Sequence, residues 1–225
     1  MQQEAPILFE DDDVVAVAKP EGLASIPEST GGRPSLLEHL APAYPGKLYI
    51  VHRLDKDVSG AILFAKNANA HRYLNQQFQH HTVQKLYLAV VHGIVNAPAM
   101  TINLPLREFG SGRVGVDRRR GKASVTEVQV HLQLPDYTLL NVSPLTGRRH
   151  QIRVHLYSAG HPVVGDRRYG DPRAQQAFPR LMLHALALIV ALPPGRTVTI
   201  EAPVPPSFQL VTDALQGQPG TAPIS

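Results

Sequence analysis

Cysteine is absent from this 225-residue chain. Its absence excludes a disulfide scaffold, thiolate zinc sites, iron–sulfur clusters and a cysteine nucleophile, and it fits a reducing compartment. The sequence also lacks a charged-then-apolar start and any unbroken apolar run of the roughly 18 residues that a membrane span needs. We therefore expect a cytoplasmic protein that has no membrane partner and folds without disulfide bonds.

Three catalytic patterns are missing as well. No Gly-x-Ser-x-Gly nucleophile elbow is present, which argues against a serine hydrolase. His150, His155 and His161 are five and six residues apart, whereas two ligands on one helix are three or four apart, so we expect no metal. A glycosidase would have to use Asp55 and Asp57, and no neighbouring residue marks one of them as the acid.

Positive charge is present but unevenly spread. The formal net charge is +4, and the 22 Lys and Arg residues are concentrated in segments 113–122, 148–153 and 167–173. Local concentrations of this kind indicate an anionic partner, and nucleic acid fits best. The alternative is a solvated basic surface.

Residues 52–60, His-Arg-Leu-Asp-Lys-Asp-Val-Ser-Gly, separate two apolar runs, 48–51 and 61–65. The runs look like buried strands, and a segment this charged cannot continue one of them, because an unpaired buried charge costs several kcal/mol. We interpret it as a loop at a cleft, with Leu54 anchored inward and Asp55 facing a pocket. The alternative is a charged turn that ends at Ser59-Gly60.

The remaining pattern predicts an α+β fold with a mixed, mostly antiparallel sheet and flanking helices, as one domain over residues 1–225 with a flexible tail over 217–225. Ser35 and Asn69 are the predicted N-caps of two helices, the second with Leu74 and Phe78 on one face. A third helix follows Pro205-Pro206. The predicted strands or strand pairs are 7–9 with 14–18, 84–95, 125–134 with 138–142, 181–192 and 198–200.

Residues 107–122 form a glycine-rich basic loop between strands. Gly110-x-Gly112-x-x-Gly115 spells a dinucleotide fingerprint, but no helix follows to receive a pyrophosphate, so we discount it. A mobile arm that contacts phosphates suits this composition better. The candidate phosphate contacts are Arg113, Arg118, Arg119, Arg120 and Lys122.

Residues 147–160 predict a core-packed helix. Ile152 and Leu156 fall on one face, Arg149 and Arg153 lie four apart on another, and Gly160 occupies a C-cap position. A guanidinium group next to a carboxylate stabilises the anion, so Arg153 would keep Asp55 ionised and usable as a nucleophile or base. The alternative is an amphipathic helix with a solvated basic side.

Five ordered motifs resemble RNA pseudouridine synthases of the RluA type. They are residues 52–60, residues 147–170, residues 15–23 with Lys19-Pro20, the pattern Lys85-x-Tyr87-x-Ala89-x-Val91-x-Gly93, and Gly121-Lys122-x-Ser124-x-Thr126. Leu183-His184-Ala185 follows in the same order. The resemblance covers roughly residues 7–205, and ordered motifs are a specific signal.

The resemblance implies a deep catalytic cleft and conversion of a uridine in ribosomal RNA or tRNA to pseudouridine, without a cofactor. Asp55 takes the place of the catalytic aspartate, Arg153 of its partner, and Tyr87 of the tyrosine against the base. Leu183 matches the apolar wall of the uracil pocket, and Arg53 would fill the gap left by an extruded base. The other predicted substrate contacts are His52, Lys85, Arg118, Arg119, Arg120, Lys122 and Arg149.

Two positions depart from the family pattern, with Val58 and Arg149 each replacing a threonine. We expect the catalytic domain alone, without the S4 RNA-binding domain that many relatives carry, and a monomer that binds an RNA stem-loop. The competing interpretations are an inactive RNA-binding protein of the same fold and a hydrolase that uses Asp55. The target RNA and uridine are set by RNA shape and loop contacts, which the sequence does not specify.

Overall fold

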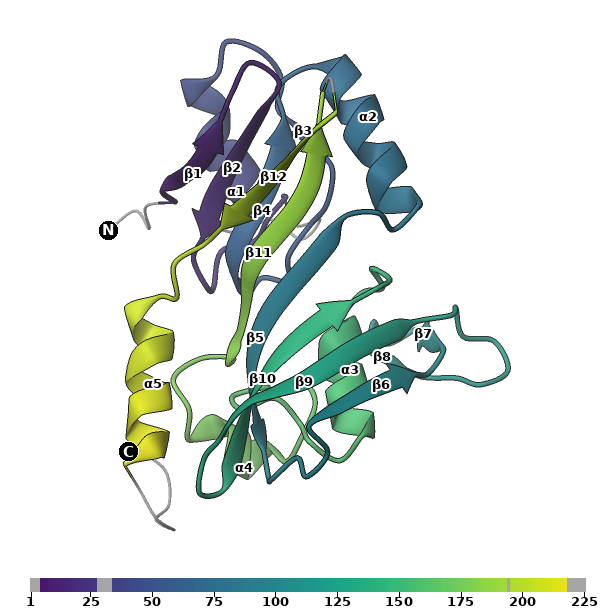
Figure 1. Ribbon diagram of the computed structural model, residues 1–225, viewed down its shortest axis with the longest axis vertical. Coiled ribbons are helices and arrows are strands. Elements are labelled where there is room, and N and C mark those ends of the chain that lie inside the picture. The colour runs from purple at the N-terminus through teal and green to yellow at the C-terminus, as the bar shows by residue number, and fades with distance from the viewer. Residues whose placement is uncertain (1–4, 28–33, 194, 218–225) are drawn as a thin grey trace. The chain divides into compact units, whose positions relative to one another are not determined.

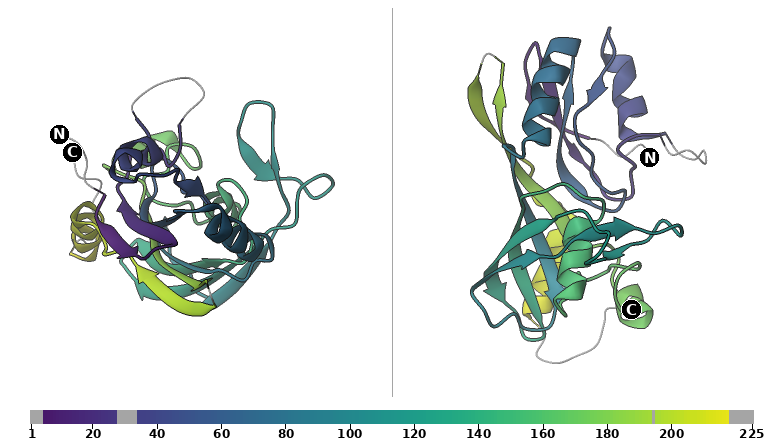
Figure 2. Two further views of the ribbon diagram at one scale, coloured as in Figure 1. Left: turned by 90° about the horizontal axis from the view of Figure 1, so that it is seen from above. Right: turned by 90° about the vertical axis from the view of Figure 1, so that its right-hand side faces the viewer.

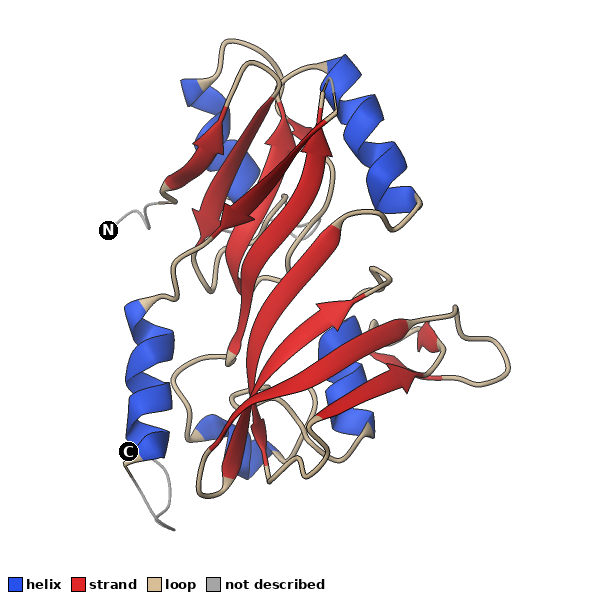
Figure 3. Ribbon diagram, viewed as in Figure 1, coloured by secondary structure: helices blue, strands red, loops and turns tan. Residues whose placement is uncertain are grey.

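The computed structural model describes residues 5–27, 34–193 and 195–217, and the chain divides into two compact units (Figure 1). Unit 1 comprises Met1–Lys85 and Ala185–Pro203, and unit 2 comprises Leu86–His184 and Val204–Ser225. Both contain antiparallel strands and a few helices, as Figure 3 shows, so the predicted α+β class is confirmed. The single domain stays a prediction, and the predicted tail lies, beyond Gly217, outside the described residues.

Unit 1 begins with the predicted hairpin, which is confirmed. Strands β1 (Ile7–Glu10) and β2 (Val14–Lys19) are antiparallel, and the acidic turn between them is closed by Asp11. Its Oδ1 accepts the amides of Asp13 and Val14, both at 2.9 Å. Strand β2 then pairs along β4 (Ser59–Ala65), and this pairing fixes the chain that leaves the charged loop.

Strand β4 is the centre of unit 1, because all seven of its residues are buried. The short strand β3 (Tyr49–Ile50) pairs with its far end, and β11 (Leu183–Leu192) pairs with β12 (Arg196–Glu201). Gly60 lies so close to β11 that a Cβ atom there would stand 2.2 Å from the Ala185 carbonyl oxygen. Only glycine fits at this position, and its φ of +123° imposes the same restriction.

Two helices cover this sheet. Helix α1 (Leu36–Leu40) has the predicted Ser35 N-cap, completed to a capping box by Glu38, and runs into the short 3-10 helix η1 (Ala41–Ala43). Helix α2 (Ala68–Gln79) is capped by Asn67 and not by Asn69, so the predicted N-cap was wrong by two residues. Its Leu74 is buried in a core built mainly from β2, β4, β11 and β12.

Unit 2 contains four antiparallel strands in the order β5-β10-β9-β6. Their bounds are β5 (Gln84–His92), β6 (Ala99–Asn103), β9 (Val125–Gln133) and β10 (Tyr137–Pro144). The predicted hairpin over residues 125–142 is confirmed. Strand β5 is buried through Leu88–Val91, as its dense apolar run predicts, and it ends at His92 because Gly93 turns the chain with a φ of +80°.

The basic segment 107–122 is not a plain loop. Strands β7 (Leu106–Glu108) and β8 (Val114–Val116) pair within it as a separate two-stranded sheet, which Figure 2 shows standing out from the four-stranded sheet of unit 2. We refer to residues 106–122 as the basic hairpin. The glycine motif therefore leads into a strand, β8, and not into the helix that a dinucleotide fingerprint requires.

Three helices complete unit 2: α3 (Gln151–Ser158), α4 (Pro172–Gln176) and α5 (Pro206–Gln216). The α3 prediction was partly wrong, because His150 has a φ of +53° at the N-cap and Arg149 therefore precedes the helix. Gly160 has the predicted left-handed conformation. None of the helices in the described ranges combines the length and apolar character that crossing a membrane requires.

Candidate active site

The loop from residue 51 to residue 58 joins β3 to β4 and carries Asp55. Leu54 is 5% exposed, so the predicted inward anchor is confirmed. The buried Ser25 hydroxyl donates to the Leu54 carbonyl at 2.8 Å and accepts the Leu54 amide at 3.1 Å. The Val58 amide then donates to the Asp55 carbonyl at 3.1 Å and closes a turn. The backbone on both sides of Asp55 is thereby fixed.

Lys19, the last residue of β2, holds the other side of this turn. It is 1% exposed, and its Nζ donates to the carbonyl oxygens of Pro20 at 2.8 Å, Leu23 at 2.7 Å and Lys56 at 2.9 Å. A buried ammonium group is tolerated only when its donors are satisfied, and three carbonyls satisfy it here. The motif pattern alone does not indicate this role, in which Lys19 binds the residue next to Asp55.

His52 anchors the start of the loop. Its Nε2 accepts the Leu63 amide at 3.0 Å. Leu63 precedes Phe64 and Ala65, the two residues of β4 that pair with β3. The His52 ring also stacks on Phe78, with the ring centroids 4.8 Å apart. Burial, followed by the nearby charge of Lys85, lowers the His52 pKa to about 3. The ring is therefore neutral at ordinary pH, and its contacts favour a role in fixing the loop over the predicted RNA contact.

The side chains that remain at the surface of the loop are charged. Asp55 is partly exposed, whereas Arg53, Lys56 and Asp57 are exposed. Lys85, at the start of β5, is mostly buried, and this burial lowers its pKa to about 8. A carboxylate on a rigid backbone suits covalent or acid–base chemistry, because the reacting atoms must be positioned closely.

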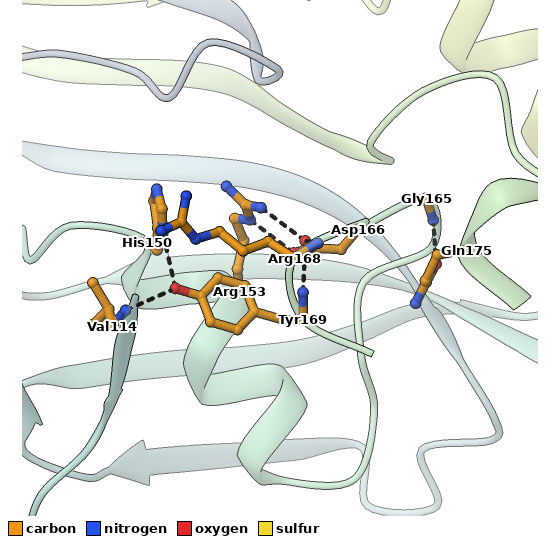
Figure 4. A network of polar contacts seen from close by, with 8 residues as sticks. All are labelled: Val114, His150, Arg153, Gly165, Asp166, Arg168, Tyr169 and Gln175. Atoms are coloured by element: carbon orange, nitrogen blue, oxygen red, sulfur yellow. Dashed lines mark hydrogen bonds and ion pairs between the residues drawn. The ribbon is translucent and has the colours of Figure 1, made fainter. Parts of the chain in front are cut away.

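Arg153 of α3 is the second candidate and lies in unit 2, 5% exposed. Its Nε and Nη2 donate to the two carboxylate oxygens of Asp166, both at 2.7 Å (Figure 4). Asp166 Oδ1 also accepts the amides of Arg168 at 3.0 Å and Tyr169 at 3.1 Å. Sequence reasoning missed Asp166 because nothing in the spacing marks it as a partner. The pairing of Arg153 with Asp55 stays a prediction.

Tyr169 lies beneath this ion pair and is 1% exposed. The guanidinium carbon of Arg153 is 5.2 Å from its ring centroid, and that of Arg113 is 5.5 Å away. The hydroxyl accepts the Val114 amide at 3.1 Å and lies 2.9 Å from His150 Nδ1. Arg113 therefore contacts an aromatic ring although, like Arg118, Arg119 and Arg120, it is exposed.

The segment 160–170 that carries Asp166 and Tyr169 is itself held in place. The Gly165 amide donates to Gln175 Oε1 at 2.6 Å (Figure 4). A Cβ atom at Gly165 would stand 1.8 Å from the Arg180 carbonyl oxygen, and its φ is +74°. Glycine is therefore required here so that the backbone can place Asp166 against Arg153.

The other predicted contacts fall in different environments. Arg118, Arg119 and Arg120 are exposed on the basic hairpin, where Asp117 accepts the amides of Arg119 and Arg120. These amides, of Arg120 first, and the Arg107 side chain lower the Asp117 pKa. Two more predicted cations are exposed: Lys122, and Arg149, which forms an ion pair with Glu108. Tyr87 on β5 is half-buried, and Leu183 is 3% exposed.

Comparison with known proteins shows which family the chain belongs to. Residues 13–158 match the family model for RNA pseudouridylate synthase. The chain belongs to this family. It is 38% identical over 228 residues to ribosomal large subunit pseudouridine synthase C of Pasteurella multocida, covering 96% of this chain and 70% of that protein. It is 41% identical over 193 residues to the dual-specificity RNA pseudouridine synthase RluA of Vibrio vulnificus, covering 81% and 76%.

Solved structures agree. The pseudouridine synthase chain resembles human RNA pseudouridylate synthase domain containing 1 with a TM-score of 0.77 and 28% identity, over 97% of both chains. It resembles human RNA pseudouridylate synthase domain containing 4 with a TM-score of 0.78 and 25% identity, over 93% of this chain and 92% of that one. Family members are isomerases that convert uridine in RNA to pseudouridine, and the predicted fold and enzyme class are confirmed.

Replacing Lys19 tests its hold on the loop. Lys19→Met keeps the apolar stem but removes the donor from three carbonyls, so we expect the free energy of unfolding to fall by about 2–5 kcal/mol and turnover to fall with it. Urea denaturation and a pseudouridine assay measure the two effects. Lys47→Met is the control, because Lys47 is exposed and contacts only the face of the Tyr49 ring among the interactions described. Wild-type stability in Lys19→Met would contradict the assignment.

The neutral His52 ring predicts a pH dependence. The ring is unprotonated in the folded state down to a pKa of about 3, whereas a histidine in the unfolded chain takes up a proton near its ordinary pKa of 6.5. This contribution to stability is complete above pH 6.5 and is lost as the pH falls toward 3. Between these limits we expect wild type to lose about 1.4 kcal/mol per pH unit more than His52→Gln.

Denaturant titrations at several pH values measure this difference. His39→Gln serves as the control, because His39 is exposed on α1 and its removal leaves the His52 imidazole in place. Parallel pH profiles for wild type and His52→Gln would show that His52 takes up its proton in the folded protein.

Proposed function

We propose that this chain isomerises a uridine in large-subunit ribosomal RNA, with Asp55 as the catalytic carboxylate, Arg153 as its charge partner and no cofactor. The observation that carries the proposal is the fixed loop around Asp55. Ser25 binds both backbone groups of Leu54, and Lys19 binds the Lys56 carbonyl, so the residues on either side of Asp55 are clamped. Neither clamp would be needed for a solvated turn.

The reaction rearranges bonds within one nucleotide. The C1′–N1 bond breaks, the uracil turns, and a C1′–C5 bond forms while C5 loses its proton to water and N1 gains one. An ionised Asp55 serves either as a nucleophile at C1′ or as a base toward a ribose proton. Both routes need the anion and a rigid position, which the clamped loop supplies.

The other residues take supporting roles in this proposal. Arg153 would stabilise the Asp55 anion. Its two hydrogen bonds to Asp166 leave the guanidinium group little freedom to move, which supports this role. Tyr87 would lie against the uracil and Leu183 would form an apolar wall. Arg53, which is exposed beside Asp55, would occupy the space left by the extruded base. Lys85 and Arg149 would contact the RNA backbone.

The choice of ribosomal RNA rests on the relatives. The Pasteurella multocida protein is named for the ribosomal large subunit, and the Vibrio vulnificus RluA is named as dual-specific. Transfer RNA is therefore the second candidate. That the enzyme works as a monomer in the cytoplasm stays a prediction.

Asp55→Asn tests the catalytic role. The substitution keeps the size of the side chain but removes the anion, so isomerisation should fall by at least about 10³-fold. Release of tritium from C5-labelled uridine in large-subunit ribosomal RNA and tRNA measures turnover directly. RNA binding should persist, because the change removes a negative charge from a site that faces a polyanion.

Asp57→Asn is the matched control, because Asp57 lies in the same loop and is exposed. It should release tritium at the wild-type rate. Release by Asp55→Asn near the wild-type rate would remove Asp55 from the chemistry. Binding without release from either RNA by wild type would favour an inactive RNA-binding protein.

Neutralising the basic hairpin tests its contact with phosphate. Replacing Arg118, Arg119 and Arg120 with Ser should weaken RNA binding and reduce the slope of log K against log salt by roughly 0.7–0.9 for each lost contact. Filter binding between about 50 and 200 mM salt gives the slope. Arg196→Ser is the control, since Arg196 is an exposed cation at the start of β12. An unchanged slope would exclude the hairpin from the interface.

A further inference from the structure

Tyr169 is the residue on which the basic hairpin and Arg153 converge, and all the residues concerned belong to unit 2. Its side chain is almost fully buried, yet its ring faces two guanidinium groups, those of Arg153 and Arg113. One of these cations is the candidate partner of the catalytic carboxylate. The other belongs to the hairpin that carries the exposed arginines.

The Tyr169 hydroxyl attaches the hairpin to the rest of unit 2. It accepts the amide of Val114, the first residue of β8, and it contacts His150 at the N-cap of α3 (Figure 4). Tyr169 also shares a small apolar core with Leu106 and Val114 of the hairpin and with Val154 of α3. A single side chain therefore joins β7, β8 and the helix that carries Arg153.

The segment around Tyr169 adds two further links. Arg168 Nη2 donates to the Gly112 carbonyl of the hairpin at 2.6 Å. In the other direction, the Tyr169 amide donates to Asp166 Oδ1, the oxygen that also accepts Arg153 Nη2. Displacement of the hairpin would therefore shift residues 166–169, which orient Arg153.

We propose that Tyr169 is a positioning residue that couples docking of the basic hairpin to the orientation of Arg153. This inference rests on the proposed function. RNA that binds the exposed hairpin cations would hold the hairpin against Tyr169, and Tyr169 would in turn hold the guanidinium group that serves Asp55. Because the Tyr169 hydroxyl holds the hairpin and its ring lies against Arg153, loss of the hydroxyl weakens RNA binding, and loss of the ring lowers turnover as well.

Two substitutions separate the hydroxyl from the ring. Tyr169→Phe keeps the ring beneath both guanidinium groups but releases Val114 and His150, so KM should rise about 3- to 10-fold with kcat within about twofold of wild type. Tyr169→Leu also removes the ring, and kcat should fall by at least about 10-fold. Tyr157→Phe is the control, because Tyr157, on α3, is 44% exposed and its ring lies beside that of Tyr169. Its kinetics should match wild type.

A double-mutant cycle distinguishes coupling from two independent defects. The hairpin triple variant, with Arg118, Arg119 and Arg120 replaced by Ser, is combined with Tyr169→Phe, and tritium release gives KM and kcat. If Tyr169 docks the hairpin, the triple substitution should raise KM less in the Tyr169→Phe protein than in wild type. Effects on KM that multiply would overturn the proposal, as would a folded Tyr169→Leu protein with wild-type kcat.

Thermal unfolding of each variant shows which proteins are folded. Should Tyr169→Leu fail to fold, the cycle with Tyr169→Phe decides alone, because that variant keeps the buried ring. Failure of this inference differs from failure of the proposed function. If wild type releases no tritium, the proposed function is wrong. If wild type is active but the two sets of substitutions raise KM independently, only the coupling is wrong.

Discussion

The Asp55 loop depends on one buried positive charge. The Lys19 ammonium group is removed from water and is satisfied by the carbonyl oxygens of Pro20, Leu23 and Lys56. A buried ammonium group that loses its acceptors destabilises the folded protein strongly. The three carbonyl groups are therefore held in place by the cost of leaving the charge unpaired. The turn at Lys56 thereby acquires the rigidity of β2, and β2 is paired along its whole length with β4, the buried centre of unit 1.

Unit 2 fixes Arg153, the proposed charge partner, by a different interaction. Arg153 is oriented by two parallel hydrogen bonds to Asp166, and such bidentate pairs restrict direction as well as distance. The carboxylate is positioned beforehand, because it also accepts the amides of Arg168 and Tyr169. The geometry of the guanidinium group is therefore set by the backbone of segment 160–170, which explains why a glycine at position 165 and a buried ring at position 169 belong to the same motif.

Local pattern was enough to predict the parts of the fold that local physics decides. Two apolar runs around an acidic turn predicted the first hairpin and alternation predicted the second. The capping residue Ser35 predicted α1, and the dense apolar run predicted β5. Two nearby asparagines can cap the same helix, so the choice of Asn67 over Asn69 follows from tertiary contacts, including Asn67 Nδ2 donating to Asp13. The hairpin inside 106–122 was missed because its strands are three residues each. The start of α3 was misplaced because His150 adopts a positive φ that non-glycine residues seldom adopt.

The candidate site was predicted in its residue types but not in its supports. Asp55 and Arg153 stand out as charges beside apolar runs, whereas Asp166 and Ser25 look like ordinary loop residues until the chain is folded. A loop left to itself samples many backbone conformations, and each ordered residue costs about 1–2 kcal/mol of entropy. A single reactive carboxylate therefore needs several residues that never touch the substrate. The length of the family motifs is the consequence, since Lys19 holds a backbone turn and Asp166 holds a guanidinium group around the proposed catalytic side chains.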